Sequence, residues 1–137
     1  MINNKSNIFL AGHKGMVGSS ILRKLSHYKY KNVVTLNKKK LDLLDQKKVF
    51  YHLRKIKPEI VIIAAARAGG IYANSNNKAK FIYENIQIQS NLIHGSYLAG
   101  VKNLIFLGSS CIYPKEISKP IKESNLLEGK LEITNDS

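Results

Sequence analysis

Apolar residues recur along this chain in two patterns that alternate. Short apolar runs predict buried strands at Asn7–Ala11, Val33–Leu36, Glu59–Ala64 and Asn103–Leu107. Apolar residues at helical spacing predict helices at Met16–Tyr28, Asp45–Ile56 and Lys78–Ala99. Strands that alternate with helices are typical of a parallel α/β sheet. With right-handed crossovers we predict a partial Rossmann fold, a doubly wound parallel sheet with strand order 3-2-1-4.

Local signals mark where these elements begin and end. Asp45 is the expected N-cap of the second helix, and Gly100 suits the C-cap of the third. Residues 65–77 and the segment from Gly108 onward are predicted to be loop or irregular. The strand at Asn103–Leu107 has the composition of a buried central strand, yet it is predicted to be an edge strand with no strand on its outer side.

Length and composition narrow the class of protein. The 137 residues fit one domain, and a hydrophobic fraction of 44% supports a packed core. No apolar run approaches the ~20 residues of a membrane span, so we expect no membrane partner. The polar N-terminus lacks a signal peptide's apolar segment, and a single cysteine, Cys111, excludes a disulfide framework. A cytoplasmic location is therefore expected.

The formal net charge of +13 raises the question of nucleic acid as a partner. The basic residues are mostly lysines spread along the chain, without the interleaved aromatic residues that single-strand binders use. We therefore expect no nucleic-acid partner. An anionic small ligand such as a nucleotide accounts for part of the charge, and a lysine-rich surface accounts for the rest.

A glycine-rich turn joins the first predicted strand to the first helix. In a βαβ unit such a turn receives the pyrophosphate of a dinucleotide, because backbone N–H groups and the helix N-terminus face the phosphates. Its spacing, GxxGxxG, is typical of the short-chain dehydrogenase/reductase superfamily. The alternative is a glycine turn that binds nothing. The predicted pyrophosphate-binding residues are Gly12, His13, Lys14, Gly15, Met16, Val17 and Gly18.

The segment after the second strand favours NADP over NAD. NAD-binding proteins of this class usually carry Asp or Glu there, whereas this chain has Thr-Leu-Asn followed by three lysines. Lys38 and Lys14 would suit a 2′-phosphate, although a lysine run is often simply solvated. Asp42 and Leu43 are expected to border the adenine. Small residues after the third strand either approach the cofactor or serve helix-sheet packing: Ala64, Ala65 and Ala66.

Two candidate catalytic residues follow the fourth predicted strand, where open α/β sheets place their ligands. The Ser109 hydroxyl is able to hydrogen-bond a keto oxygen, and the Cys111 thiol to transfer protons. The alternatives are a turn hydroxyl for Ser109 and an inert thiol for Cys111. The four histidines show no ligand spacing, so no metal site is predicted.

Several of these motifs together resemble GDP-L-fucose synthase, an NADP-dependent epimerase and reductase. The resemblance covers the whole chain and implies that the protein takes part in converting GDP-4-keto-6-deoxy-D-mannose to GDP-L-fucose. It implies that Ser109 contacts the keto oxygen, that Cys111 is an acid/base in epimerisation, and that Leu107, Gly108, Ser109 and Ser110 line the nicotinamide. The motifs are AGHKGMVGS (Ala11–Ser19), AAARAGGI (Ala64–Ile71), FIYEN (Phe81–Asn85), FLGSSCIYP (Phe106–Pro114) and LEGKLEITN (Leu127–Asn135).

The chain departs from the family pattern at its end. The resemblance places a Tyr-x-x-x-Lys pair shortly after Thr134-Asn135, and this sequence stops at Ser137. We therefore expect residues 1–137 to be the N-terminal part of an NADP-binding Rossmann domain, without the substrate domain, that is poorly stable and binds cofactor without turnover. The expected partner is a second copy or a complementing C-terminal half. The alternatives are a non-catalytic nucleotide-binding module and another NAD(P)-dependent sugar-nucleotide epimerase or dehydratase.

Overall fold

The computed structural model describes residues 2–117 and 120–133 of the chain. The residues Thr134-Asn135, used in the family resemblance, lie outside this described part. The chain divides into two compact units. The first comprises Met1–Arg67 and Ile82–Leu107, and the second comprises Ala68–Phe81 and Gly108–Ser137.

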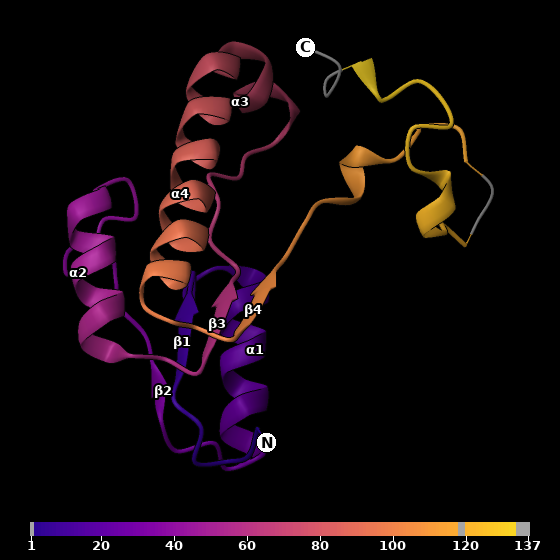
Figure 1. The fold of residues 1–137 in the computed structure, drawn as a ribbon. Helices are drawn as coiled ribbons and strands as arrows, with labels where there is room; N and C mark the ends of the chain where they lie inside the picture. Colours follow the sequence, from indigo (N-terminus) through magenta and orange to yellow (C-terminus); the bar gives the residue numbers. More distant parts are fainter. Residues whose placement is uncertain (1, 118–119, 134–137) are drawn as a thin grey trace. The chain divides into compact units, whose positions relative to one another are not determined.

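The first unit is built on a parallel sheet of four strands (Figure 1). β1 (Ile8–Ala11) and β3 (Ile60–Ile63) are buried along their full length, as the apolar runs predict. β2 (Val33–Val34) and β4 (Asn103–Phe106) flank them. All pairs are parallel, which confirms the predicted partial Rossmann architecture.

The predicted strand order of 3-2-1-4 is wrong, because the sheet has the order β2-β1-β3-β4. β3 pairs with the edge of β1 opposite β2, and hydrogen bonds just before the strands fix it there. The N–H of Glu59 donates to the Asn7 carbonyl at 2.8 Å, and the N–H of Asn7 donates to the Glu59 carboxylate at 3.0 Å. β2 has only two half-buried residues, and a strand on its outer edge would gain little burial. The winding direction therefore reverses between β1 and β3.

Helices cover both faces of this sheet (Figure 1). α1 (Met16–His27) packs on one face, where Ile21, Leu22 and Leu25 meet the side chains of Ile8, Leu10, Ile60 and Ile62. α2 (Gln46–Ile56) and α4 (Lys78–Leu98) pack on the other face. α2 and α4 approach closely at Gly95, where a Cβ would lie 2.9 Å from side-chain carbons of Leu53 and Phe50.

The element boundaries agree with the sequence in most places. Asp45 caps α2 by accepting a hydrogen bond from the Lys48 N–H at 3.0 Å, and Gly100 has a φ of +74° after α4. The predicted loop at residues 65–77 is partly wrong, because α3 (Ile71–Asn76) forms within it. The segment after Gly108 contains two short 3₁₀ turns, at Ser110–Ile112 and Glu123–Asn125.

The outer edge of β4 has no strand partner within the described residues. Its apolar side chains are exposed on both faces of the sheet, with Leu104 at 37%, Ile105 at 50% and Phe106 at 45%. The apolar composition of β4 therefore predicted a buried strand, whereas no part of the described chain fully covers its side chains. No helix in that part is long and apolar enough to cross a membrane.

The cap at Asp45 makes the stability of the first unit depend on pH. The Lys48 backbone N–H, with the Lys48 ammonium 3.1 Å away, holds the pKa of Asp45 below its usual value of 3.8. A carboxyl group whose pKa is lower in the folded state stabilises that state above its unfolded pKa. This stabilisation disappears as the pH falls through the folded value.

We therefore expect Asp45→Ala to lower the free energy of unfolding at pH 7 and to lower it by less at pH 3. Asp45→Asn, which keeps a capping oxygen without a titrating charge, is the control. Urea unfolding at both pH values measures the difference between each variant and the parent chain. An equal loss for Asp45→Ala at pH 7 and pH 3 would contradict the assignment.

Candidate functional site

The turn after β1 depends on a glycine that approaches β3. Gly12 has a φ of +88°, and a Cβ at this position would lie 2.4 Å from the Ala64 carbonyl oxygen. Only glycine combines this backbone conformation with so close an approach. The carboxyl ends of β1 and β3 are thereby held together where the winding of the sheet reverses, which is where open α/β sheets bind ligands.

The other two glycines of the turn have different roles. Gly18 is buried in α1, and a Cβ there would lie 2.1 Å from the Gly12 carbonyl oxygen, so Gly18 allows the helix to pack on the turn. Gly15 is the N-cap of α1 in an extended conformation, and the nearest atom to its Cβ would be the Gly12 oxygen at 3.4 Å. The backbone at Gly15 is therefore accessible to a ligand without being required by packing.

The N-terminus of α1 offers backbone donors to such a ligand. No side chain caps this helix, and its first turn contains no acidic residue. The N–H groups of Met16, Val17 and Gly18 have no helical acceptor, because the first helical hydrogen bond is donated by Ser19 to Gly15 at 2.8 Å. These donors and the helix dipole form a site that favours an anion.

A cavity of about 400 Å³ lies beside this turn in the first unit. Most of the predicted cofactor residues of this unit line it: Gly12, His13, Lys14, Gly15, Lys38, Asp42, Leu43, Ala64, Ala65 and Ala66. Met16, Val17, Gly18 and Leu107 do not. Leu107 instead donates its N–H to the Ile63 carbonyl at 3.2 Å. The sequence missed further lining residues: Leu36, Asn37, Leu41, Leu44, Arg67, Glu84 and Ile88.

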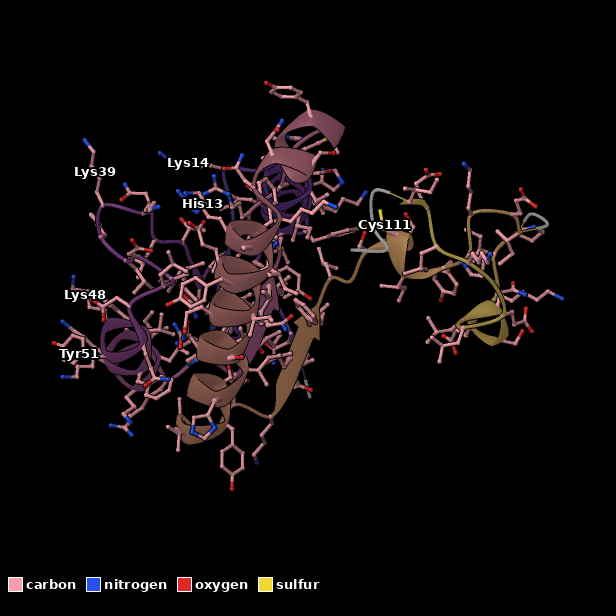
Figure 2. All side chains as sticks on the ribbon, turned by 90° about the horizontal axis from the view of Figure 1, so that it is seen from above. His13, Lys14, Lys39, Lys48, Tyr51 and Cys111 are labelled. Atoms are coloured by element: carbon pink, nitrogen blue, oxygen red, sulfur yellow. The ribbon has the colours of Figure 1, made fainter. Side chains whose placement is uncertain are left out.

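The part of the cavity formed by the glycine turn and by the segment that follows β2 is basic. Lys14 and Lys38 are exposed and line it, and Figure 2 shows His13 and Lys14 projecting from the turn. Asn37 occupies the position where an acidic residue would bind a ribose. Its side-chain oxygen accepts from the Lys40 N–H at 3.1 Å, which closes the local turn. The Asp42 carboxylate likewise accepts from the Leu44 N–H at 3.1 Å.

An ion pair that the sequence did not reveal lies on the opposite wall. The Arg67 guanidinium is 2.8 Å from the Glu84 carboxylate, with 34% and 16% of the two side chains exposed. Next to it, the Asn85 amide accepts from the Arg67 N–H at 2.7 Å and donates to the Arg67 carbonyl at 3.0 Å. These bonds attach the chain after β3 to α4. Both partners belong to motifs of the family resemblance, but a pattern of residues does not show such a pairing.

The predicted catalytic residues lie in the second unit, together with Gly108 and Ser110. The Ser109 hydroxyl oxygen accepts a hydrogen bond from the Cys111 N–H at 3.2 Å and caps the turn Ser110–Ile112. Its own proton remains available for donation. The Cys111 thiol is free and exposed. The described residues contain no cluster of three or more His, Cys, Asp or Glu side chains that would hold a metal.

One Tyr-x-x-x-Lys spacing does occur in the chain, at Tyr51 and Lys55, which were not among the predicted site residues. Tyr51 lies on the outer face of α2 (Figure 2) and is 60% exposed, and Lys55 is exposed as well. The Lys55 ammonium is 5.9 Å from the Tyr51 ring centroid. Neither residue lines the cavity beside the glycine turn, so this pair does not supply a proton donor there.

Comparison with known proteins extends these observations. The chain is 51% identical over 136 residues to a putative GDP-L-fucose synthase 2 of Arabidopsis thaliana, covering 99% of this chain and 42% of that protein. It is also 51% identical over 129 residues to a GDP-L-fucose synthase of Sinorhizobium fredii, covering 94% and 41%. The chain thus spans about two-fifths of the length of these relatives. The resemblance to GDP-L-fucose synthase is confirmed.

Solved structures agree with the fold. MlghC, a GDP-mannoheptose reductase from Campylobacter jejuni with NADP bound, superposes with a TM-score of 0.91 at 38% identity. That alignment covers 99% of this chain and 43% of MlghC. Residues 8–136, which include the glycine turn, the cavity wall, Ser109 and Cys111, match the model of one sequence family. The chain belongs to the NAD dependent epimerase/dehydratase family.

Proposed function

We propose that the first unit binds NADP(H) in the cavity beside the glycine turn. The observation that carries this proposal is the turn itself. Gly12 and Gly18 bring β1, β3 and α1 so close together that a Cβ at either position would clash, and Gly15 leaves the backbone open. The uncapped N-terminus of α1 supplies donors for a pyrophosphate. The NADP bound to MlghC supports the same ligand.

The basic end of the cavity supports NADP(H) rather than NAD(H). Lys14 and Lys38 would neutralise a 2′-phosphate. No carboxylate competes for the ribose at Asn37, whose amide oxygen is already engaged by the Lys40 N–H. Asp42 and Leu43 line the cavity and would border the adenine, while Ala64–Ala66 would allow the cofactor to approach the sheet.

We further propose that residues 1–137 act as the N-terminal part of an NADP-dependent enzyme that converts GDP-4-keto-6-deoxy-D-mannose to GDP-L-fucose. The identity to GDP-L-fucose synthases supports this substrate. Within this proposal the Ser109 hydroxyl donates a hydrogen bond to the keto oxygen, Cys111 transfers the protons of epimerisation, and Leu107–Ser110 line the nicotinamide. The bound cofactor supplies a hydride.

The proposed location is the cytoplasm, and the proposed partner is a second copy or a polypeptide that completes the fold.

Gly15→Ala should weaken NADPH binding about tenfold and leave the thermal midpoint nearly unchanged, because the added methyl group meets the ligand but not the protein core. Gly18→Ala should instead destabilise the fold, because its Cβ would overlap the Gly12 carbonyl. NADPH fluorescence titration and thermal unfolding measure the two effects. Gly70→Ala, where a Cβ meets no atom within 4 Å, is the control. Unchanged affinity in Gly15→Ala would argue against a pyrophosphate at the turn.

Lys38→Ala should weaken NADPH binding about fivefold and leave the weaker NADH affinity unchanged, because only NADPH carries the 2′-phosphate. The neighbouring Lys39→Ala is a matched control, since Lys39 does not line the cavity and its side chain projects outward from the chain (Figure 2). Titrations of both nucleotides at low and high salt measure the effect. An equal loss for both substitutions would indicate general electrostatic attraction rather than a specific contact.

The chain by itself should bind NADPH and fail to oxidise it with GDP-4-keto-6-deoxy-D-mannose. The physical reason is that Tyr51 and Lys55, the chain's Tyr-x-x-x-Lys pair, lie outside the cavity. Loss of absorbance at ~340 nm measures NADPH oxidation by its reduced nicotinamide. The Sinorhizobium fredii relative serves as the positive control. Turnover by this chain at the relative's rate would refute the prediction.

A further inference from the structure

A polar amide side chain, that of Asn91, is buried in the apolar layer between the sheet and its helices. Asn91, in the middle of α4, is 0% exposed, and its neighbour Leu92 belongs to the core. A buried amide without partners destabilises a fold by roughly 1–3 kcal/mol, so its presence calls for an explanation from its hydrogen bonds.

The Asn91 amide is satisfied on both sides. Its Nδ2 group donates to the Leu43 carbonyl at 2.8 Å. Its Oδ1 atom accepts from the Gln87 amide at 2.8 Å and from the Gln46 amide at 3.4 Å. The Leu43 carbonyl can only accept, so it requires the Asn91 amide nitrogen to face it, and the two glutamine amides then donate to the Asn91 oxygen. Asn91 thus connects α4, the start of α2 and the segment before α2.

The segment that Asn91 holds is a wall of the cavity. Leu41, Asp42, Leu43 and Leu44 all line it. Local hydrogen bonds shape this segment, from the Leu44 N–H to the Asp42 carboxylate and from the Asp45 N–H to the Asp42 carbonyl, both at 3.1 Å. They set its curvature, and Leu41 and Leu43 pack against the core shared with α2 and α4. The bond from Asn91 adds a directed polar connection to α4 at the residue predicted to border the adenine.

We propose that Asn91 is a positioning residue for the adenosine end of the cofactor, acting through the Leu43 carbonyl. This inference rests on the proposed NADP(H) function. A leucine at position 91 would suit the apolar surroundings, but it would leave the Leu43 carbonyl without its donor. The wall would then be free to shift away from the base, and the ligand would have to order it again on binding.

The test compares the parent chain with Asn91→Leu, using adenosine 2′,5′-bisphosphate and NADPH as ligands. Both dissociation constants are measured by calorimetry at a temperature where circular dichroism shows every variant fully folded. Loss of stability alone does not change affinity under that condition. We expect both ligands to bind about fivefold more weakly, by the same factor, because both carry the adenosine end.

A matched control separates positioning from general loosening. Leu53 is 0% exposed in the same apolar layer and makes no side-chain hydrogen bond to the wall, so Leu53→Ala should lower the thermal midpoint without changing either affinity. Unchanged affinities in Asn91→Leu, or an equal loss in Leu53→Ala, would overturn the inference. If the parent chain binds neither ligand, the proposed function itself fails, which is a different result.

A second variant keeps the inference testable if Asn91→Leu does not fold. Gln87→Leu leaves the Asn91 donor in place but removes the stronger of the two bonds that orient it. We expect both ligands to bind about twofold more weakly, again by the same factor. Unchanged affinities in a folded Gln87→Leu chain would overturn the role assigned to the amide network.

Discussion

The close approach of the Gly12 backbone to the Ala64 carbonyl is the constraint on which the first unit depends. It exists because β1 and β3 are adjacent and the chain reverses its winding between them. The absence of a Cβ at Gly12 and Gly18 allows a strand, a turn and a helix N-terminus to meet at one point. The cavity lies there, lined at this point by Gly12, Gly15 and Ala64, whose side chains are absent or small.

The rest of the cavity depends on connections made from α4. Asn85 attaches the chain after β3 through both backbone groups of Arg67, and Asn91 attaches the wall before α2 through the Leu43 carbonyl. Both anchors are asparagine amides that use a donor and an acceptor together. A single helix therefore positions two parts of the cavity wall, and Asn85 and Asn91 are explained by the backbone groups that they satisfy.

Much of the architecture was predictable because it depends on local patterns. The apolar runs located the strands, helical spacing located α1, α2 and α4, and capping chemistry located Asp45. The strand order was not predictable in this way, because it depends on which edges of β1 are occupied, and the bonds between Asn7 and Glu59 join residues 52 positions apart. The Arg67–Glu84 and Asn91–Leu43 contacts were not predictable for the same reason. The number of residues between the two partners does not show which face of a helix packs against which loop.

The exposed apolar edge of β4 affects the tendency of the chain to self-associate in solution. A strand with unpaired backbone groups and apolar side chains on both faces is a template for the same strand of another molecule. The tendency of such edges to associate grows with concentration, whereas the folding of one molecule does not. Colloidal behaviour, and not the unfolding free energy, therefore sets the highest concentration at which this chain stays dispersed.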